Sequence, residues 1–203
     1  MICFNGKGTL SVIYGPMRSA KSGELIKLCS DAEEYQHKKG IVFKPDIDNR
    51  FSDTSVVSRL GTSLPAINIP CDLKDILEEV KSKGTISETN LLDKDFVAFD
   101  ECQFFSKEIV DIIYILLKYK KDVVVAGLNL DFTGNPIGSI NTLLLMADNP
   151  IQKHAYCSCC GEPAFYTQLL DGTSGKPVTK AESNVVVGEA LYEPRCRNCY
   201  VHE

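Results

Sequence analysis

LSVIYGPMRSAKSGEL, residues 10–25, is the stretch that decides the fold of this 203-residue sequence. Its first five residues form a short apolar run, as a buried strand would, and the next residues are a Gly-Pro turn. Apolar residues then recur at the spacing of a helix: Leu25, Leu28, Cys29, Ala32 and Tyr35. The order strand, glycine-containing turn and helix is the setting in which a phosphate-binding loop occurs.

Gly15 to Ser22 match the phosphate-loop pattern of Gly, four residues, Gly, Lys and Ser/Thr at every position but one. The candidate phosphate-binding residues are Gly15, Pro16, Met17, Arg18, Ser19, Ala20, Lys21 and Ser22. Loop amides and the positive end of the helix would bind phosphate oxygens, Lys21 would reach the β- and γ-phosphates, and Ser22 would ligate Mg²⁺. The alternative is a structural turn followed by a helix with a solvated lysine.

Ala20 stands where the pattern has its second glycine. If this position has a positive φ, the Cβ costs on the order of 1–2 kcal/mol. If φ is negative, the methyl group needs only clearance from the phosphate. The amide of residue 20 survives in both cases, so we expect a weakened nucleotide site rather than a lost one.

FVAFDE, residues 96–101, reads as an apolar strand that ends in two acids. Asp100 is the candidate Mg²⁺ residue, and Glu101 could accept a proton from an attacking hydroxyl. Ligands of open α/β sheets bind at the carboxyl ends of the strands, where the Gly15 loop is also expected. The alternative is an acidic pair that caps the end of a strand.

Strands and helices alternate through the first three quarters of the sequence, which predicts a parallel sheet with helices on both faces. Further strands are expected at 41–44 and 122–128, and further helices around 73–80, 109–117 and 140–148.

Other segments lack this periodicity. Residues 45–65 are polar and rich in turn formers, so we expect a loop that could fold over a ligand. From about residue 154, cysteines, glycines and turns replace the periodic segments. We therefore expect two domains, residues 1–153 and 154–203.

Four of the nine cysteines occur as two close pairs, Cys157-x-x-Cys160 and Cys196-x-x-Cys199. Such pairs can place four thiolates tetrahedrally around a structural Zn²⁺. The segment between the pairs, residues 161–195, exceeds the about 15–20 residues of a usual ribbon, but each doubling of a loop costs only about 0.6 kcal/mol. Disulfide or redox pairs are the alternatives. A disulfide is disfavoured because the N-terminus MICFNGKGTL has no apolar signal core, and we expect a cytoplasmic, reducing location.

The composition excludes some classes of function. A hydrophobic share of 44%, a charged share of 24% and a net charge of −5 are typical of an ordinary globular protein. No basic stripe indicates a nucleic-acid partner, and no apolar run reaches the about 18 residues that a membrane span needs.

The sequence resembles the thymidine kinases that combine a phosphate-loop domain with a zinc-binding lasso domain. Seven segments match in the order of that family: GPMRSAKSGEL, VFKPDIDNR, SRLGTSLPA, FDECQFF, GLNLDFTGNPIG, CSCCG and VVVGEALYEPRCRNCY. The resemblance implies an α/β fold with a P-loop (RecA-like) parallel sheet flanked by helices, followed by a small C-terminal zinc-ribbon or lasso domain.

The resemblance also implies a reaction, the transfer of the γ-phosphoryl group of ATP to the 5′-hydroxyl of thymidine, with Mg²⁺ bound. Glu101 would be the base, and Arg50 and Asp48 would lie near the phosphates and the sugar. The residues implied to line the thymine pocket are Met17, Phe104, Leu128 and Phe132. Tyr192 would pack on the nucleoside, and main-chain groups of Val185, Val186 and Val187 would read the edge of the base.

A homotetramer and feedback inhibition by dTTP are further implications of the resemblance. The sequence departs from the family pattern at Ala20 and Gly23 in the loop, at Asn129, where an aspartate is usual, and at Ile137, where a phenylalanine is usual. Ala20 and Asn129 motivate an alternative, a weakly active or inactive homologue that binds nucleoside or nucleotide as a sensor or partner, whereas the intact Glu101 and Lys21 oppose it. A zinc-ribbon nucleic-acid binder is a third possibility that the negative charge opposes.

Overall fold

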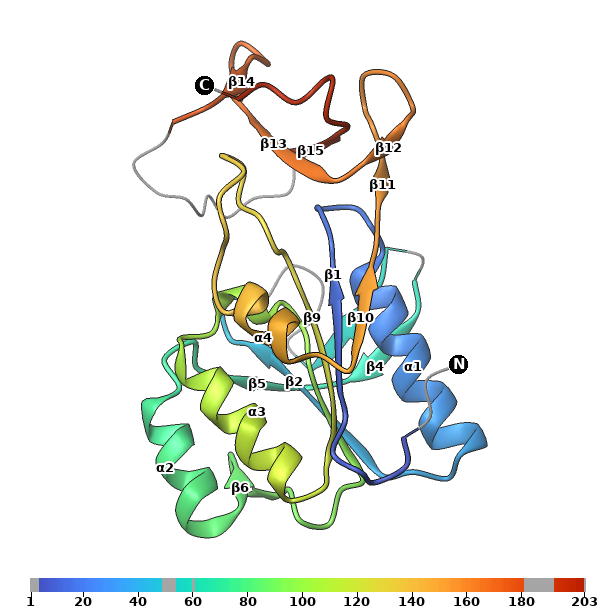
Figure 1. Ribbon diagram of the computed structural model, residues 1–203, viewed down its shortest axis with the longest axis vertical. Coiled ribbons are helices and arrows are strands. Elements are labelled where there is room, and N and C mark those ends of the chain that lie inside the picture. The colour runs from blue at the N-terminus through green and yellow to red at the C-terminus, as the bar shows by residue number, and fades with distance from the viewer. Residues whose placement is uncertain (1–3, 49–53, 60, 181–191, 203) are drawn as a thin grey trace.

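The computed structural model describes residues 4–48, 54–59, 61–180 and 192–202. Its centre is a sheet of six parallel strands (Figure 1). In spatial order the strands are β10 (Asn149–Gln152), β1 (Leu10–Tyr14), β9 (Asp122–Gly127), β8 (Phe96–Phe99), β2 (Gly40–Pro45) and β5 (Ile67–Ile69). This architecture confirms the predicted α/β class with a P-loop (RecA-like) parallel sheet.

Helices cover both faces of the sheet. Helix α1 (Lys21–Tyr35) lies on one side, and α2 (Lys74–Lys83), α3 (Glu108–Lys118) and α4 (Ile140–Met146) lie on the other (Figure 1). A short 3-10 helix, η1 (Cys102–Phe104), follows β8. Among the described residues, no helix is both long enough and apolar enough to cross a membrane.

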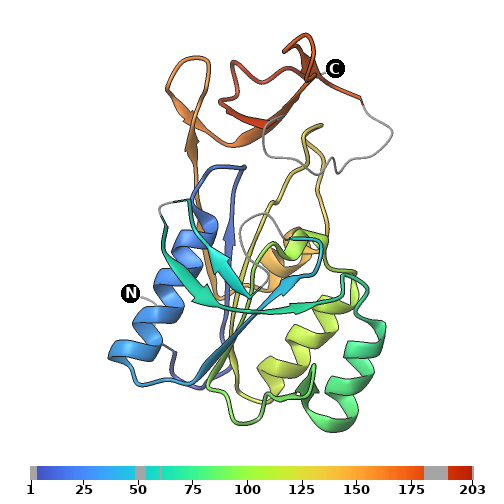
Figure 2. The same ribbon diagram turned by 180° about the vertical axis from the view of Figure 1, so that it is seen from behind.

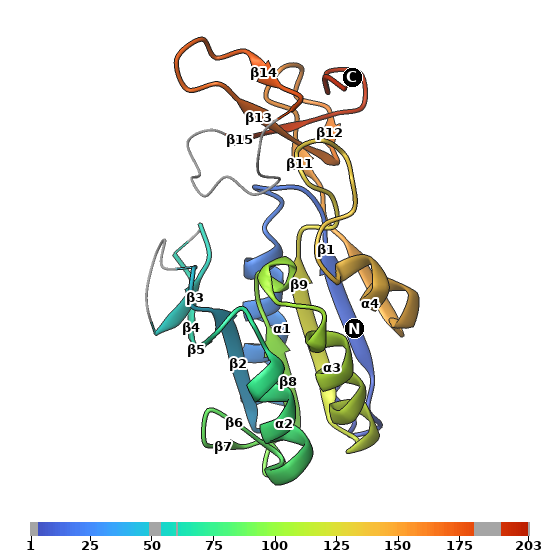
Figure 3. The same ribbon diagram turned by 90° about the vertical axis from the view of Figure 1, so that its left-hand side faces the viewer.

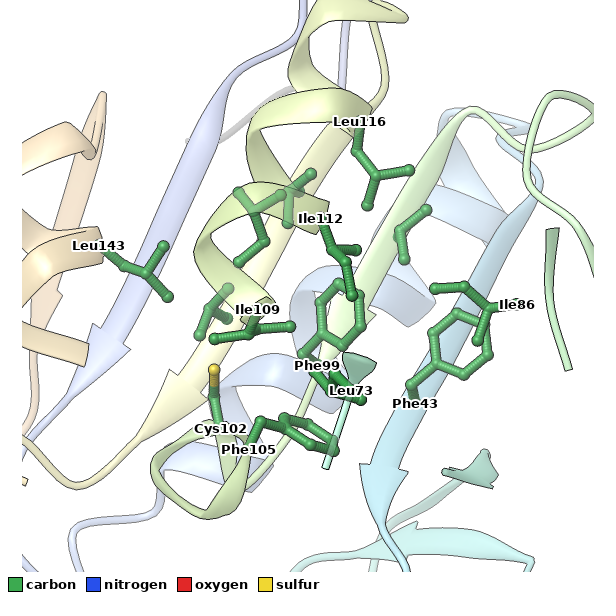
Figure 4. Packing of buried hydrophobic residues seen from close by; sticks show 14 of the residues in the cluster. Phe43, Leu73, Ile86, Phe99, Cys102, Phe105, Ile109, Ile112, Leu116 and Leu143 are labelled. Carbon is green, nitrogen blue, oxygen red and sulfur yellow. The ribbon is translucent and has the colours of Figure 1, made fainter. Parts of the chain in front are cut away.

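The two faces of the sheet form separate hydrophobic cores because successive strand residues point to opposite sides. Val97 and Phe99 join the core under α2, α3 and α4, whereas Phe96 and Ala98 join the core under α1. Phe99 packs on α3 next to Ile109, as Figure 4 shows. The predicted face of the 109–117 helix is confirmed, since Ile109, Ile112, Ile113 and Leu116 are all buried.

The parallel register brings four strand ends to the same edge of the sheet. Tyr14 pairs with Gly127, and Phe99 pairs with both Phe43 and Val125. The residues that follow these strands therefore emerge close together, as ligand-binding residues of open α/β sheets do.

The expected loop at 45–65 contains two short strands, β3 (Ser55–Val57) and β4 (Ser63–Pro65), which form an antiparallel hairpin. Val56 and Leu64 join the core under α1, and Figure 2 shows the hairpin beside that helix. A second hairpin, β6 (Thr85–Ile86) with β7 (Thr89–Asn90), follows α2.

The chain after β10 forms small antiparallel sheets that lie beyond the carboxyl end of the central sheet (Figure 3). Strands β11 (Ala155–Tyr156) and β12 (Pro163–Ala164) pair, and β13 (Tyr166–Leu170) lies between β14 (Pro177–Val178) and β15 (Tyr192–Arg195). The change from parallel to antiparallel pairing falls between Gln152 and Ala155. Our division of the chain at 153/154 remains an interpretation consistent with this change.

Candidate functional site

The backbone angles of the loop between β1 and α1 decide between the two cases considered for Ala20. Ala20 lies in the left-handed region, with φ 58° and ψ 34°, and Arg18 also has a positive φ of 62°. The first of our two cases therefore applies, and the Cβ of Ala20 carries a strain of about 1–2 kcal/mol. The residue does not stop the chain from forming the loop, because α1 begins at Lys21 directly after it.

Lys21 is only 9% exposed and lies across the loop. Its Nζ donates to the carbonyl oxygen of Pro16 at 2.7 Å, and the hydroxyl of Ser19 donates to the same oxygen at 2.8 Å. The ammonium group of Lys21 is thereby held against the loop main chain, where an anionic group would be bound.

The start of the loop is fixed against the chain that leads to the C-terminal domain. Lys153 N donates to the Tyr14 carbonyl at 2.7 Å, and its side chain forms an ion pair with Glu24 at 2.8 Å. A Cβ on Gly15 would overlap the carbonyl oxygen of Lys153. Only glycine allows these two segments to pass so closely.

Asp100 and Glu101 follow β8 at the same edge of the sheet. Asp100 is 3% exposed. Burial and the neighbouring Glu101 carboxylate raise the pKa of Asp100 to about 7, while a hydrogen bond with Ser22 acts in the opposite direction. Carboxylate and hydroxyl oxygens are ligands that suit Mg²⁺, and a bound cation would offset the cost of ionising this buried carboxyl group.

Glu101 itself has a left-handed backbone, with φ 46°, and stands at the start of η1. Its Oε2 accepts a hydrogen bond of 2.6 Å from Nε2 of Gln103. Residues 15–22 together with Asp100 and Glu101 are called the phosphate side of the site below.

Two residues near the phosphate side were missed by the sequence interpretation. Lys44, at the end of β2, is 2% exposed and donates to the main-chain carbonyl of Asp48 at 2.8 Å. Gln103 is buried in η1. A charged residue that ends an otherwise apolar strand, and a polar residue between Cys102 and Phe104, were the available signals. The predicted Arg50 lies outside the described residues.

An apolar cluster adjoins the loop from the side of the C-terminal domain. Its members are Met17, Phe132, Leu169, Val178 and Tyr192. It is called the nucleoside side below, after the role that the family resemblance implies for some of these residues. Three of them, Met17, Phe132 and Tyr192, are residues that the family resemblance assigned to the substrate pocket.

Hydrogen bonds tie the nucleoside side together across the domains. Met17 N donates to the Thr167 hydroxyl at 3.0 Å, and the Tyr200 hydroxyl donates to the Phe132 carbonyl at 2.7 Å. These bonds join the phosphate loop and the segment after β9 to the antiparallel sheet.

The other predicted pocket residues are not members of this cluster. Phe104 lines an open pocket with Cys71 and Phe105, and Leu128 is half-buried with its amide bonded to Gln103. Val185, Val186 and Val187 lie outside the described residues.

The four predicted metal ligands come together at the base of the antiparallel sheet. The Sγ atoms of Cys157, Cys160, Cys196 and Cys199 all lie within 4.8 Å of one another, and two of these distances are 3.6 and 3.7 Å. A tetrahedral Zn²⁺ with bonds of about 2.3 Å separates its sulfurs by about 3.8 Å, so the donors fit this ion.

The thiols of this cluster compete for protons. Hydrogen bonds with Cys196 and then Cys160 raise the pKa of Cys199 to about 12. Desolvation also opposes ionisation of Cys157, but hydrogen bonds with Cys196 and Cys160 lower its pKa to about 7. Adjacent thiolates repel one another unless they share a cation, so this cluster could bind zinc as a closed, structural site.

A loop of the phosphate-binding pattern after β1, an acidic pair after β8, which only β9 separates from β1, and a cysteine cluster are typical of a P-loop nucleotide-binding fold with a possible zinc site. The family model described as thymidine kinase matches residues 8–200. This chain therefore belongs to the thymidine kinase family, and membership supports a nucleoside kinase function.

Two solved structures that match this chain have low sequence identity to it. A structure titled as a DNA replication initiation factor has 15% identity and a TM-score of 0.43, and the match covers 74% of this chain and 42% of that one. The replication initiator DnaA bound to AMPPCP and single-stranded DNA also has 15% identity and a TM-score of 0.43, with coverage of 73% and 41%. This chain thus spans about two fifths of the length of these proteins, and nothing about its function is drawn from them.

Proposed function

We propose that this protein is an ATP-dependent thymidine kinase, which transfers the γ-phosphoryl group of ATP to the 5′-hydroxyl of thymidine and forms dTMP for pyrimidine salvage. The observation that carries the proposal is the common location of the phosphate side and the nucleoside side. Met17 belongs to both, so a bound nucleoside next to it would lie beside the phosphate loop.

Each part of the phosphate side has a task in this reaction. The 5′-hydroxyl attacks the γ-phosphorus, its proton passes to the Glu101 carboxylate, and the bond from the γ-phosphorus to the bridging oxygen breaks to release ADP. Lys21 would neutralise charge on the phosphates. Asp100 and Ser22 would hold Mg²⁺, which supplies further neutralisation of the phosphate oxygens when it is bound.

The nucleoside side supplies the remaining requirements. Phe132, Leu169 and Tyr192 are buried against one another, and Met17 and Val178 form the partly exposed edge of this cluster. A pyrimidine ring and its methyl group would pack against that apolar edge. Closing this surface over the base would exclude water and limit hydrolysis of ATP. The homotetramer and the inhibition by dTTP remain predictions from the family resemblance.

The proposal is tested by measuring dTMP and ADP formation from thymidine, ATP and Mg²⁺. Wild-type protein should turn over, and Glu101→Gln should lose about 10²- to 10⁴-fold in kcat because the base is gone, while thymidine still binds. Glu34→Gln, an exposed position on α1, is the matched control and should keep full activity.

The outcomes separate the proposal from its alternative. Unchanged turnover in Glu101→Gln would remove this residue as the base. Thymidine or ATP binding without any turnover by the wild-type chain would favour the inactive, nucleotide-binding homologue, for which the strained Ala20 is the specific observation.

A further inference from the structure

Gln103 makes two hydrogen bonds with different partners inside the protein, and it is only 6% exposed. Its Nε2 donates to Oε2 of Glu101 at 2.6 Å, and its Oε1 accepts from the main-chain N–H of Leu128 at 3.0 Å. The side chain thus connects the end of β8 with the residue that follows β9.

The bond with Leu128 determines which end of the amide faces Glu101. A main-chain N–H can only donate, so it selects the oxygen of the Gln103 amide. The nitrogen is then directed at the carboxylate, to which it can only donate. The donor that Glu101 meets is therefore oriented by the backbone after β9 rather than by Glu101 itself.

Two glycines make room for Gln103. A Cβ on Gly127 would lie 2.7 Å from Oε1 of Gln103, and a Cβ on Gly138 would lie 2.5 Å from its carbonyl oxygen. Gly138 also has a positive φ of 54°. Gly127 thus leaves space for the Gln103 side chain, and Gly138 leaves space for the Gln103 main chain.

We propose that Gln103 is a positioning residue for Glu101, which holds the carboxylate in the orientation needed to accept the proton of the nucleoside hydroxyl. The inference rests on the proposed function of Glu101 as the base. A glutamate side chain has three rotatable bonds, and a charge-assisted hydrogen bond from a fixed donor restricts them. Because Leu128 begins the segment that leads to Phe132, the same bond links the base to the nucleoside side.

The test is Gln103→Met, which keeps the length and apolar bulk of the side chain but removes both hydrogen bonds. We expect kcat to fall about 10- to 100-fold, since a small misplacement of a reacting group has effects of this size. The KM values for ATP and thymidine should stay within about two-fold, because the two hydrogen bonds that the variant removes go to Glu101 and to the main chain of Leu128, and to no residue of the loop or the apolar cluster. Gln36→Met, which removes one hydrogen bond to Phe4 far from the site, should leave kcat unchanged.

A double-mutant cycle separates positioning from general structural support. In a Glu101→Gln background, Gln103→Met should cause no further loss, because the group that it positions is already absent. Losses that multiply, or a raised KM with unchanged kcat, would overturn the inference. No turnover by the wild-type chain would overturn the proposed function and this inference with it, whereas full kcat in Gln103→Met beside an inactive Glu101→Gln overturns the inference alone.

Gln103→Glu provides the second variant if the methionine variant does not fold. It retains an acceptor for the Leu128 amide but places a carboxylate against Glu101 instead of a donor. We expect at least the same loss of kcat. The exchanged pair, Glu101→Gln with Gln103→Glu, should be more thermally stable than Gln103→Glu alone, while turnover stays lost. An exchanged pair that is no more stable than Gln103→Glu would contradict the assignment. Full activity of Gln103→Glu would contradict it as well.

Discussion

The phosphate side and the nucleoside side of the site are assembled in different ways. Each part of the phosphate side follows directly after a strand of the parallel sheet, so the hydrogen-bonded register fixes it. The nucleoside side brings together residues from the phosphate loop, the segment after β9 and the antiparallel sheet. The first depends on the central sheet, whereas the second also depends on the docking of the C-terminal domain.

Because of this difference, a substitution should be able to disrupt one side of the site and leave the other side intact. Loss of the cysteine cluster should remove the nucleoside side and leave the central sheet folded. Changes at strand ends should alter phosphate chemistry and leave the apolar cluster intact. The following predictions test this separation, from the largest expected effect to the smallest.

Cys196→Ser should have the largest effect on the nucleoside side. Structural zinc sites contribute roughly 10 kcal/mol or more of binding free energy, and a missing thiolate opens the site. We expect loss of stoichiometric zinc and of thymidine binding, measured by metal analysis and calorimetry, with the circular dichroism of the sheet and helices retained. Cys159→Ser, an exposed cysteine outside the cluster, is the matched control. Retained zinc in Cys196→Ser would refute the four-thiolate site.

Asp100→Asn should stabilise the metal-free protein while it abolishes turnover. The raised pKa means that the folded state disfavours the ionised carboxylate, so wild-type stability should fall as pH rises from about 4 to about 7. Asparagine removes this penalty, which is on the order of a few kcal/mol above pH 7. Urea unfolding in EDTA at several pH values measures the difference, which should vanish near pH 4.

An opposite pH trend provides the control for Asp100. Hydrogen bonds from Ser174 lower the pKa of the exposed Asp171, so this group contributes stability above its usual pKa and loses it as pH falls. Asp171→Asn should therefore be neutral or destabilising at neutral pH. A destabilised Asp100→Asn at pH 8 would show that burial of this carboxyl group is not unfavourable.

Thr167→Val should weaken the link between the two sides of the site. It leaves Met17 N without its partner, which costs about 1–3 kcal/mol when the donor remains buried. We expect the KM for thymidine to rise more than the KM for ATP, as steady-state kinetics would measure. Thr167→Ser keeps the hydroxyl and should behave like the wild type. Equal changes in both KM values would mean that the two sides do not fail separately.

Ala20→Gly should have the smallest effect. Glycine relieves the left-handed strain of about 1–2 kcal/mol. It also increases the conformational entropy of the unfolded chain, which lowers the free energy of unfolding by about 0.4–1 kcal/mol. We expect a net stabilisation below about 1 kcal/mol and a modest decrease in the KM for ATP. Ala147→Gly, at an extended residue with φ −71°, should destabilise the protein. An inactive wild-type protein whose turnover is restored by Ala20→Gly would show that the loop alone is defective.

The phosphate side was predictable because its information is local. An apolar run followed by a glycine loop, or by two acids, identifies a strand and its carboxyl end within a few residues. The cluster of four cysteines was predictable for the same reason, since each pair has a spacing of its own. In both places the structure brings the predicted residues together.

The misses concern interactions between distant segments. Residues 140–148 were expected to be helical and no strand was predicted after them, but α4 ends at Met146 and Asn149–Gln152 form edge strand β10. Pro150 argued against a strand here, although proline is tolerated at the edge of a sheet. The roles of Lys44 and Gln103 depend on partners from other turns, so no sequence spacing reveals them.

The contact between Gly15 and Lys153 has a mechanical consequence. The nucleotide loop and the connection to the C-terminal domain meet at one point, which the hydrogen bond from Lys153 to Tyr14 fixes. Any rotation of that domain would have its hinge at this contact. Atoms at the hinge would barely move, while Leu169 and Tyr192 would travel along a longer arc. In the proposed kinase, such a rotation would break the bond between Met17 and Thr167 but would leave the start of the loop, at Gly15, in place.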